Sequence, residues 1–162
     1  NRRGMILNRV SIEKRAVVVD QRSRIGDWEI DLVIGKSHQG AIVTIVDRLS
    51  LMTLIAKVES RHAEFVTAAT TSLLERYKEK GVHTITGDNG KEFSGHRDIS
   101  NTLNADFYFA HPYSSWERGT NENTNGLIRQ YLPKGTEFEI VNAFFFFQSC
   151  MVLSNSFPKY PQ

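Results

Sequence analysis

The first half of the chain contains three short runs of aliphatic and β-branched residues. These runs are WEIDLVIG (28–35), AIVTIVDR (41–48) and LMTLIAKV (51–58), and their residue types favour β-strands. The segments between them are short and hold Gly and Ser. Because so few residues can join only antiparallel neighbours, the pattern predicts a meander of three antiparallel strands.

Beyond position 60 the spacing of apolar residues lengthens to four. Phe65, Ala69, Leu73 and Tyr77 form one stripe, which predicts a helix over 61–80. Ser60 is a suitable N-cap, and Gly81 stands where a helix commonly ends. The remaining elements predicted by pattern are a strand at 82–86, a helix at about 95–104, a strand at 105–110 and a helix at about 116–132.

The predicted element order is therefore β-β-β-α-β-α-β-α. This order places the chain in the α/β class, with a five-stranded mixed sheet flanked by helices, and it matches the ribonuclease H-like layout. A length of 162 residues suits one compact domain.

Charge and cysteine content add two weaker indications. Residues 1–24 contain seven Lys or Arg against one Glu and one Asp, so this basic lead-in either lies on phosphates or is a solvated linker. The single Cys150 and the absence of a signal-like opening favour a cytoplasmic protein. The apolar patch 140–153 is shorter than the roughly 20 residues of a membrane span. The histidines lack zinc-site spacing, so they are interpreted as structural or surface residues.

Three carboxylates fall on separate predicted elements. Asp31 lies inside the first strand, Asp88 follows the fourth strand, and Glu122 is on the last helix. A carboxylate in a strand suited to burial needs a partner, and sites gather beyond the carboxyl ends of strands in α/β sheets. The three residues are expected to converge and to hold Mg²⁺, which prefers oxygen ligands.

Each carboxylate also has an alternative interpretation. Asp88 begins Asp-Asn-Gly, a common hairpin turn, although a helical pattern follows it. Asp31 alternates with other acidic residues on a strand face that could be half exposed, and Glu122 could be an ordinary surface glutamate. Asp47 and Glu92 are rival ligands, although Asp47 more simply pairs with Arg48 or ends its strand.

The last predicted helix separates polar and apolar residues around its axis. At 100° per residue, Arg118, Asn125, Gly126 and Arg129 lie on the side of Glu122. Leu127, Ile128 and Tyr131 lie opposite. We expect the apolar side to face the core and the polar stripe to face a nucleic-acid backbone, with Gly126 allowing close approach. The alternative is a solvated face with ion pairs inside the helix.

These motifs, taken together, resemble the catalytic core of the IS-thirty family of bacterial insertion-sequence transposases. The matching stretches are RSRIGDWEIDLVIG, TIVDRLS, TITGDNGKEF and YFAHPYSSWERGTNENTNGLIRQYLPKGT, within residues 6–139. The resemblance implies a DDE enzyme with a ribonuclease H-like fold and the acidic triad Asp31, Asp88 and Glu122. It divides the chain into a lead-in (1–24), an integrase-type catalytic core (25–139) and an atypical tail (140–162).

The resemblance further implies that two Mg²⁺ ions, replaceable by Mn²⁺, support cleavage at transposon ends and strand transfer into target DNA. Asn89 and Asn125 would orient the metal ligands, and Arg118, Arg129 and Lys134 would contact DNA. The expected partners are DNA and other copies of the chain in a synaptic complex, in a bacterial cytoplasm and near the nucleoid when DNA is bound, with no membrane.

The chain departs from the family at both ends. No stretch of this sequence resembles the helix-turn-helix region by which the family recognises transposon ends, so we expect these residues not to find ends on their own. IVNAFFFFQSCMVL stands where the family's final helix is expected, and our hypothesis is a slipped reading frame. One alternative is therefore a catalytically inactive remnant that binds only DNA or partner subunits. A ribonuclease H-like nuclease or resolvase that uses the same metals is another.

Overall fold

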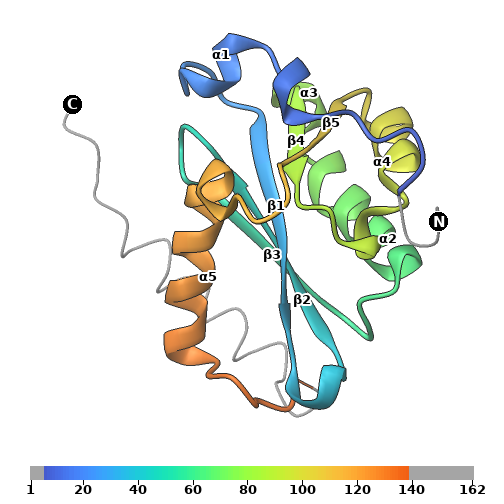
Figure 1. Ribbon diagram of the computed structural model, residues 1–162, viewed down its shortest axis with the longest axis vertical. Coiled ribbons are helices and arrows are strands. Elements are labelled where there is room, and N and C mark those ends of the chain that lie inside the picture. Colours follow the sequence, from blue (N-terminus) through green and yellow to red (C-terminus); the bar gives the residue numbers. More distant parts are fainter. Residues whose placement is uncertain (1–5, 139–162) are drawn as a thin grey trace.

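A five-stranded mixed sheet forms the centre of the molecule (Figure 1). The structure, a computed structural model, describes residues 6–138, apart from the side chain of His38. The predicted tail 140–162 and its reading-frame hypothesis therefore lie outside the described residues. The strands, in the spatial order β3-β2-β1-β4-β5, are β1 (Asp27–Ile34), β2 (Ala41–Asp47), β3 (Thr53–Val58), β4 (Thr84–Gly87) and β5 (Asp106–Phe109).

The pairing directions confirm the predicted meander. Strand β2 pairs antiparallel with both β1 and β3, as the short connections require. Strand β4 pairs parallel with β1 and with β5, because helices return the chain to the starting edge before each of these strands.

Helices cover both faces of the sheet (Figure 1). Helices α2 and α4 pack on one face over a core that includes Trp28, Ile30 and Phe107, and α5 packs on the other face over Val33 and Ile42. The helices are α1 (Val17–Asp20), α2 (Ala63–Glu75), α3 (Lys78–Gly81), α4 (His96–Leu103) and α5 (Gly119–Tyr131), with 3-10 turns at Ile12–Lys14, Lys36–His38, Lys91–Phe93 and Ser115–Arg118. In the described part of the chain, no helix is long and apolar enough to span a membrane.

The helix predicted over 61–80 is divided in the structure. Tyr77 leaves the helical conformation (φ −107°, ψ 0°) between α2 and α3, and its ring lies 5.9 Å from that of Trp28. The N-cap position is His62, whose backbone N–H donates to the Ser60 hydroxyl at 3.3 Å. Gly81 has a φ of +109°, the left-handed conformation expected where a helix ends.

Residues 6–26, before β1, pack partly against the domain. Two short helical turns occur there, and Val10 accepts a backbone hydrogen bond from Phe109 at the edge of β5. The Arg15 side chain is buried, where it donates to Thr86 at 3.0 Å and pairs with Asp20. Part of the basic charge therefore stabilises the domain itself.

Candidate metal centre

Asp31 lies on β1, and Asp88 directly follows β4, the parallel neighbour of β1. The last paired position between β1 and β4 joins Glu29 to Thr86, and each aspartate is two residues beyond it. Because side chains alternate along a strand, continuing this register places both carboxylates on the same side of the sheet. That side faces α5.

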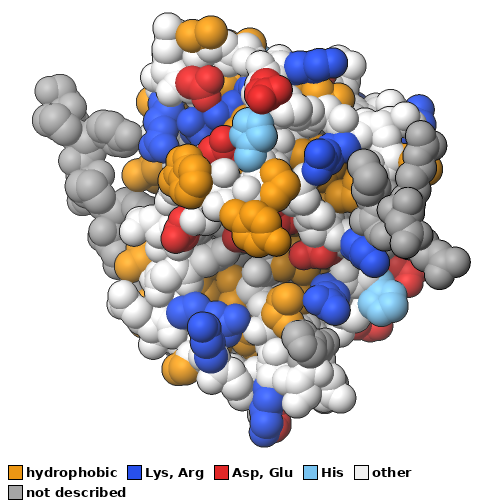
Figure 2. Space-filling view, viewed as in Figure 1, with side chains coloured by type: hydrophobic (Ala, Val, Ile, Leu, Met, Phe, Trp, Pro, Cys, Tyr) orange, Lys and Arg blue, Asp and Glu red, His pale blue; other side chains and the backbone are white. Residues whose placement is uncertain are grey.

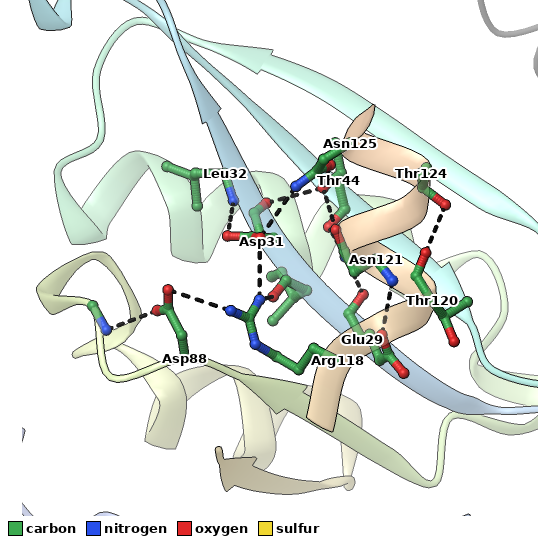
Figure 3. A network of polar contacts seen from close by, with 12 residues as sticks. Glu29, Asp31, Leu32, Thr44, Asp88, Arg118, Thr120, Asn121, Thr124 and Asn125 are labelled. Atoms are coloured by element: carbon green, nitrogen blue, oxygen red, sulfur yellow. Dashed lines mark hydrogen bonds and ion pairs between the residues drawn. The ribbon is translucent and has the colours of Figure 1, made fainter. Parts of the chain in front are cut away.

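A guanidinium lies between these two carboxylates (Figure 3). Arg118 NH1 is 3.1 Å from Asp31 Oδ2, and Arg118 NH2 is 3.6 Å from Asp88 Oδ2. The Arg118 side chain is only 10% exposed, and its NH1 also donates to the carbonyl of Ile30 at 3.3 Å. The two predicted ligands therefore share one cation, which shows that they face a common space.

The start of α5 is fixed to the sheet by a buried carboxylate on β1. Glu29 Oε2 accepts the backbone N–H of Asn121 at 2.8 Å, while Oε1 pairs with Arg48 at 2.6 Å. Glu29 and Asn121 are both 0% exposed. The Asn121 amide donates to the carbonyls of Glu29 and Thr44. These contacts set the position of α5, and hence of Glu122, relative to β1.

Asn125, one turn further along α5, reaches Asp31. Its amide donates to Asp31 Oδ2 at 3.1 Å, and its own oxygen lies 2.9 Å from the Thr44 hydroxyl. That hydroxyl also lies 3.0 Å from the amide oxygen of Asn121 and has one hydrogen to donate at a time. Thr44 thus helps to fix the amide orientation that lets Asn125 donate to the aspartate.

The prediction that the polar stripe of the last helix faces outward is wrong, because part of this stripe is buried against the sheet. Arg118 is 8% exposed and points to the sheet, whereas Tyr131, expected on the core side, is 41% exposed. The sheet beneath the first half of α5 presents carboxylates, so polar side chains pack there. The face that packs on the sheet consists of Arg118, Asn121, Thr124, Asn125, Ile128 and Leu132.

Glu122 is exposed on α5 and does not join the two aspartates in a ligand cluster. Among residues 6–138, no three His, Cys, Asp or Glu side chains are close enough together to hold a metal ion. However, Arg118 and Asn125, four residues before and three after Glu122, both contact Asp31. Arg118 lies in the 3-10 turn before α5, with φ −125° and ψ 40°, and Asn125 lies on α5 itself. The two residues that contact Asp31 therefore flank Glu122 in the sequence, while the Glu122 side chain is exposed.

Burial controls the electrostatics of the cluster. Desolvation raises the pKa of Asp31 above its usual range, although the nearby Arg118 charge and the N–H of Leu32 oppose the rise. Burial also raises the pKa of Glu92, and the charges of Asp88 and Asp31 add to that rise. Glu92 thus shares the electrostatic environment of the two aspartates, whereas the other rival, Asp47, accepts four hydrogen bonds that close the turn after β2, from Gly26, Leu49 and Ser50.

The other predicted site residues have different surroundings. Asn89 donates to the carbonyl of Ala110 at 2.6 Å and accepts from Arg9, so it holds its loop rather than a carboxylate. Arg129 donates to the carbonyl of Ile34 at 2.9 Å, and Lys134 is exposed.

The Asp-Asn-Gly segment forms a turn in which Asp88 Oδ1 accepts from Gly90 N. A 3-10 turn and α4 follow, so the hairpin alternative is wrong.

The donor atoms fit a hard divalent cation in part. Asp31 and Asp88 supply carboxylate oxygens that face one cation-sized space, and oxygen ligands of this kind suit Mg²⁺. A site with few carboxylates is normal for Mg²⁺, because water and substrate phosphates complete its coordination. The third carboxylate would come from Glu122.

Comparison with known proteins identifies the family. The family model "Integrase core domain" matches residues 21–115, which include Asp31 and Asp88 and stop before α5. This chain belongs to the integrase core domain family.

Two transposases are similar to this integrase core over most of its length. One, for insertion sequence element IS4351 of Bacteroides fragilis, is 50% identical over 141 residues, which is 86% of this chain and 43% of that protein. Another, InsI for element IS30A of Escherichia coli K12, is 39% identical over 131 residues, or 81% of this chain and 34% of that protein. The chain therefore spans less than half the length of these relatives.

A solved structure confirms the fold expected from the element order. The catalytic core domain of BIV integrase matches with a TM-score of 0.55 and 19% identity, and the match covers 81% of this chain and 82% of that one. At this identity the likeness concerns the fold alone, which is the ribonuclease H-like α/β arrangement.

Sequence reasoning missed the residues that anchor α5 in this integrase core. Glu29, Thr44, Arg48 and Asn121 are all buried, and hydrophobicity along the chain gives no sign of it. One signal was present: spacings of three and four connect Arg118, Asn121 and Asn125 with Ile128 and Leu132. A stripe that continues from polar into apolar residues indicates a helix whose buried face meets polar and then apolar parts of a sheet.

A cleft of about 470 Å³ opens beside Asp88 and Arg118 of the integrase core. His111 lines the cleft and contacts two carboxylates. Its Nδ1 lies 2.7 Å from Glu117, and its Nε2 lies 3.1 Å from Glu13. Both hydrogen bonds raise the pKa of His111, and the one to Glu117 has the larger effect. The cleft is lined by Asp88, Asn89, Gly90, Ala110, His111, Pro112, Tyr113, Ser114, Ser115 and Arg118.

Neither sign of charge dominates the face of the molecule in Figure 2. Lys and Arg side chains alternate there with Asp and Glu, in agreement with a formal net charge of only +2. On this face, any attraction for DNA would therefore depend on local groups.

Proposed function

We propose that this chain is the catalytic core of an insertion-sequence transposase, which cuts DNA strands and joins them to a target by metal-dependent phosphoryl transfer. One observation carries the proposal: the carboxylates of Asp31, on β1, and Asp88, directly after the adjacent parallel strand β4, converge on the Arg118 guanidinium. The similarity to transposases of Bacteroides fragilis and Escherichia coli supports the choice of reaction.

Asp31, Asp88 and Glu122 would hold Mg²⁺, as two ions, with Mn²⁺ as a substitute. Divalent cations at such a site supply stabilisation for the attacking and leaving oxygens of an in-line displacement. Asn125 keeps Asp31 oriented through its 3.1 Å hydrogen bond, and Asn89 fixes the loop that carries Asp88. Arg118, Arg129 and Lys134 would contact the phosphate backbone.

The partners would be transposon ends, target DNA and further copies of the same protein. We expect the transposon ends to be brought together in a synaptic complex of several copies, as the resemblance to transposases implies. The proposed setting is the bacterial cytoplasm.

One observation favours a second candidate, a remnant that binds DNA or partner subunits without cutting. In the described residues Glu122 is not clustered with the two aspartates, so this chain would need a rearrangement to assemble three ligands. The two candidates differ in one outcome, namely strand cleavage.

The test combines Mn²⁺ binding with cleavage of branched DNA. Calorimetry would compare the chain with its Asp88→Asn variant in the presence of a short DNA duplex, and circular dichroism would confirm folding. Asp98→Asn is the matched control, since Asp98 is exposed on α4. We expect Asp88→Asn alone to lose Mn²⁺ binding and cleavage. Binding without cleavage by the folded chain would favour the remnant, and binding unaffected by Asp88→Asn would contradict the proposed site.

A further inference from the structure

Arg118 occupies the space between two carboxylates to which the proposed function assigns a metal. We propose that Arg118 is an internal cation that competes with a divalent metal for Asp31 and Asp88, and that its guanidinium must leave both carboxylates before the metal binds. The inference rests on the proposed function, because it concerns the same two ligands.

The competition follows from which oxygens are already engaged. Asp31 Oδ1 accepts the backbone N–H of Leu32 at 2.8 Å, and Asp88 Oδ1 accepts that of Gly90 at 2.8 Å. In both residues the other oxygen, Oδ2, faces Arg118, and Asp31 Oδ2 also accepts from the Asn125 amide at 3.1 Å. A metal held by both aspartates would draw on the carboxylate charge and lone pairs that Arg118 now contacts, so the guanidinium and the metal would compete for them.

The hydrogen bonding of Arg118 in this position is incomplete. Its Nε is buried without a hydrogen-bond partner in the described part of the chain, and its contact with Asp88, at 3.6 Å, is longer than a hydrogen bond. A buried donor without a partner is unfavourable. The arrangement neutralises two neighbouring carboxylates while leaving the guanidinium only partly satisfied.

The cleft beside the site offers the displaced guanidinium a new partner. Arg118 and Asp88 both line this cleft of about 470 Å³. A DNA phosphate in the cleft would accept two N–H groups from Arg118 in the fork geometry that arginine favours. DNA would then draw Arg118 away from the aspartates, and metal and DNA would strengthen each other's binding. Thermodynamic linkage requires this coupling to be reciprocal.

The experiment measures Mn²⁺ affinity, by calorimetry and by the electron paramagnetic resonance signal of free Mn²⁺, without DNA. Arg118→Gln removes the competing charge, and Arg118→Lys keeps a charge but loses the fork. The matched control is Arg129→Gln on the same helix, because Arg129 donates to backbone carbonyls and contacts neither aspartate. Removing a unit charge within about 4 Å of the ligands should tighten Mn²⁺ binding about tenfold or more in Arg118→Gln. The lysine variant should fall between it and the native chain, and Arg129→Gln should change affinity less than about threefold.

A second arm repeats the titration with a short DNA duplex. DNA should tighten Mn²⁺ binding to the native chain several-fold and should have a much smaller effect on Arg118→Gln. If Arg118→Gln does not fold, as judged by circular dichroism, Arg118→Lys alone still tests the inference.

The outcomes separate this inference from the proposed function. Mn²⁺ binding that is no tighter in either Arg118 variant, yet is lost in Asp88→Asn, overturns the competition and leaves the metal site in place. Binding that Asp88→Asn does not affect overturns both. Equal tightening by Arg118→Gln and Arg129→Gln would show a general charge effect and would also overturn the competition.

Discussion

The buried carboxylate of Glu29 accepts the backbone N–H of Asn121 at 2.8 Å, at the start of the helix that carries Glu122. An acceptor at a helix N-terminus satisfies one of its unpaired N–H groups and complements the helix dipole. The same carboxylate pairs with Arg48, which is 6% exposed. One strand residue therefore joins β1, the end of β2 and α5.

Breaking the Glu29–Arg48 pair should strongly destabilise the chain. In Glu29→Gln, Arg48 stays buried without its counter-ion, which should lower the free energy of unfolding by about 3–5 kcal/mol. Urea denaturation would measure the loss, with Glu75→Gln, exposed on α2, as the control. Combining Glu29→Gln with Arg48→Met should cost less than the two single changes summed, and additive losses would show that the pair is not coupled.

Neutralising Asp31 should stabilise the metal-free chain at neutral pH. Burial raises the pKa of Asp31 in spite of Arg118, so the charged form is less favourable in the folded state than in the unfolded chain. Because the pKa is raised, the folded chain loses stability to this charge at pH values above the folded-state pKa. At pH values below the ordinary pKa of 3.8 the carboxyl is neutral in both states and the loss disappears. Asp31→Asn should therefore raise Tm by a few degrees at pH 7 in chelator, and the gain should vanish near pH 4.

Thermal unfolding at both pH values checks this prediction, with Asp98→Asn as the exposed control. A native chain more stable than Asp31→Asn at pH 7 would mean that the contacts with Arg118 and Asn125 outweigh desolvation. The expected result would place Asp31 among residues kept for function at a cost in stability.

The contacts of His111 should make the loop before α5 sensitive to pH. Its pKa is raised by hydrogen bonds to Glu117 and Glu13, so their contribution to stability is complete below the ordinary value of 6.5 and is lost as the pH rises through the folded-state pKa. The Tm difference between the native chain and His111→Gln should be largest near pH 5.5 and should shrink by pH 8.5. A difference that is constant with pH, like that of the exposed control His62→Gln, would show that His111 is not held by charge.

A methyl group at Gly126 should stabilise the helix and weaken DNA binding. No atom lies within 4 Å of a Cβ built at this position, so Gly126→Ala should add about 0.5–1 kcal/mol to the free energy of unfolding through helix propensity. If the DNA backbone approaches α5 there, duplex affinity should fall several-fold. Gly119→Ala, also in open space but in the first turn, is the control, and unchanged affinity in Gly126→Ala would mean that DNA passes elsewhere.

Local patterns in the sequence were sufficient for much of the architecture. Element order and strand directions could be predicted because they follow from local patterns. These patterns are the runs of β-branched residues in β1 and β2 and the apolar residues spaced four apart in α2. The boundaries differed where tertiary packing intervened, as at Tyr77, whose ring packs on Trp28.

The sequence alone also suggested which carboxylates to propose as metal ligands, because a carboxylate inside a strand suited to burial is costly without a partner. How those residues meet was set by the tertiary structure. The parallel pairing of β1 with β4 brings Asp31 beside Asp88. The buried Glu29 fixes the start of α5, so that Arg118 points toward the sheet. Both facts depend on residues far apart in the chain, and a hydrophobic pattern cannot distinguish a polar face that meets water from one that meets buried carboxylates.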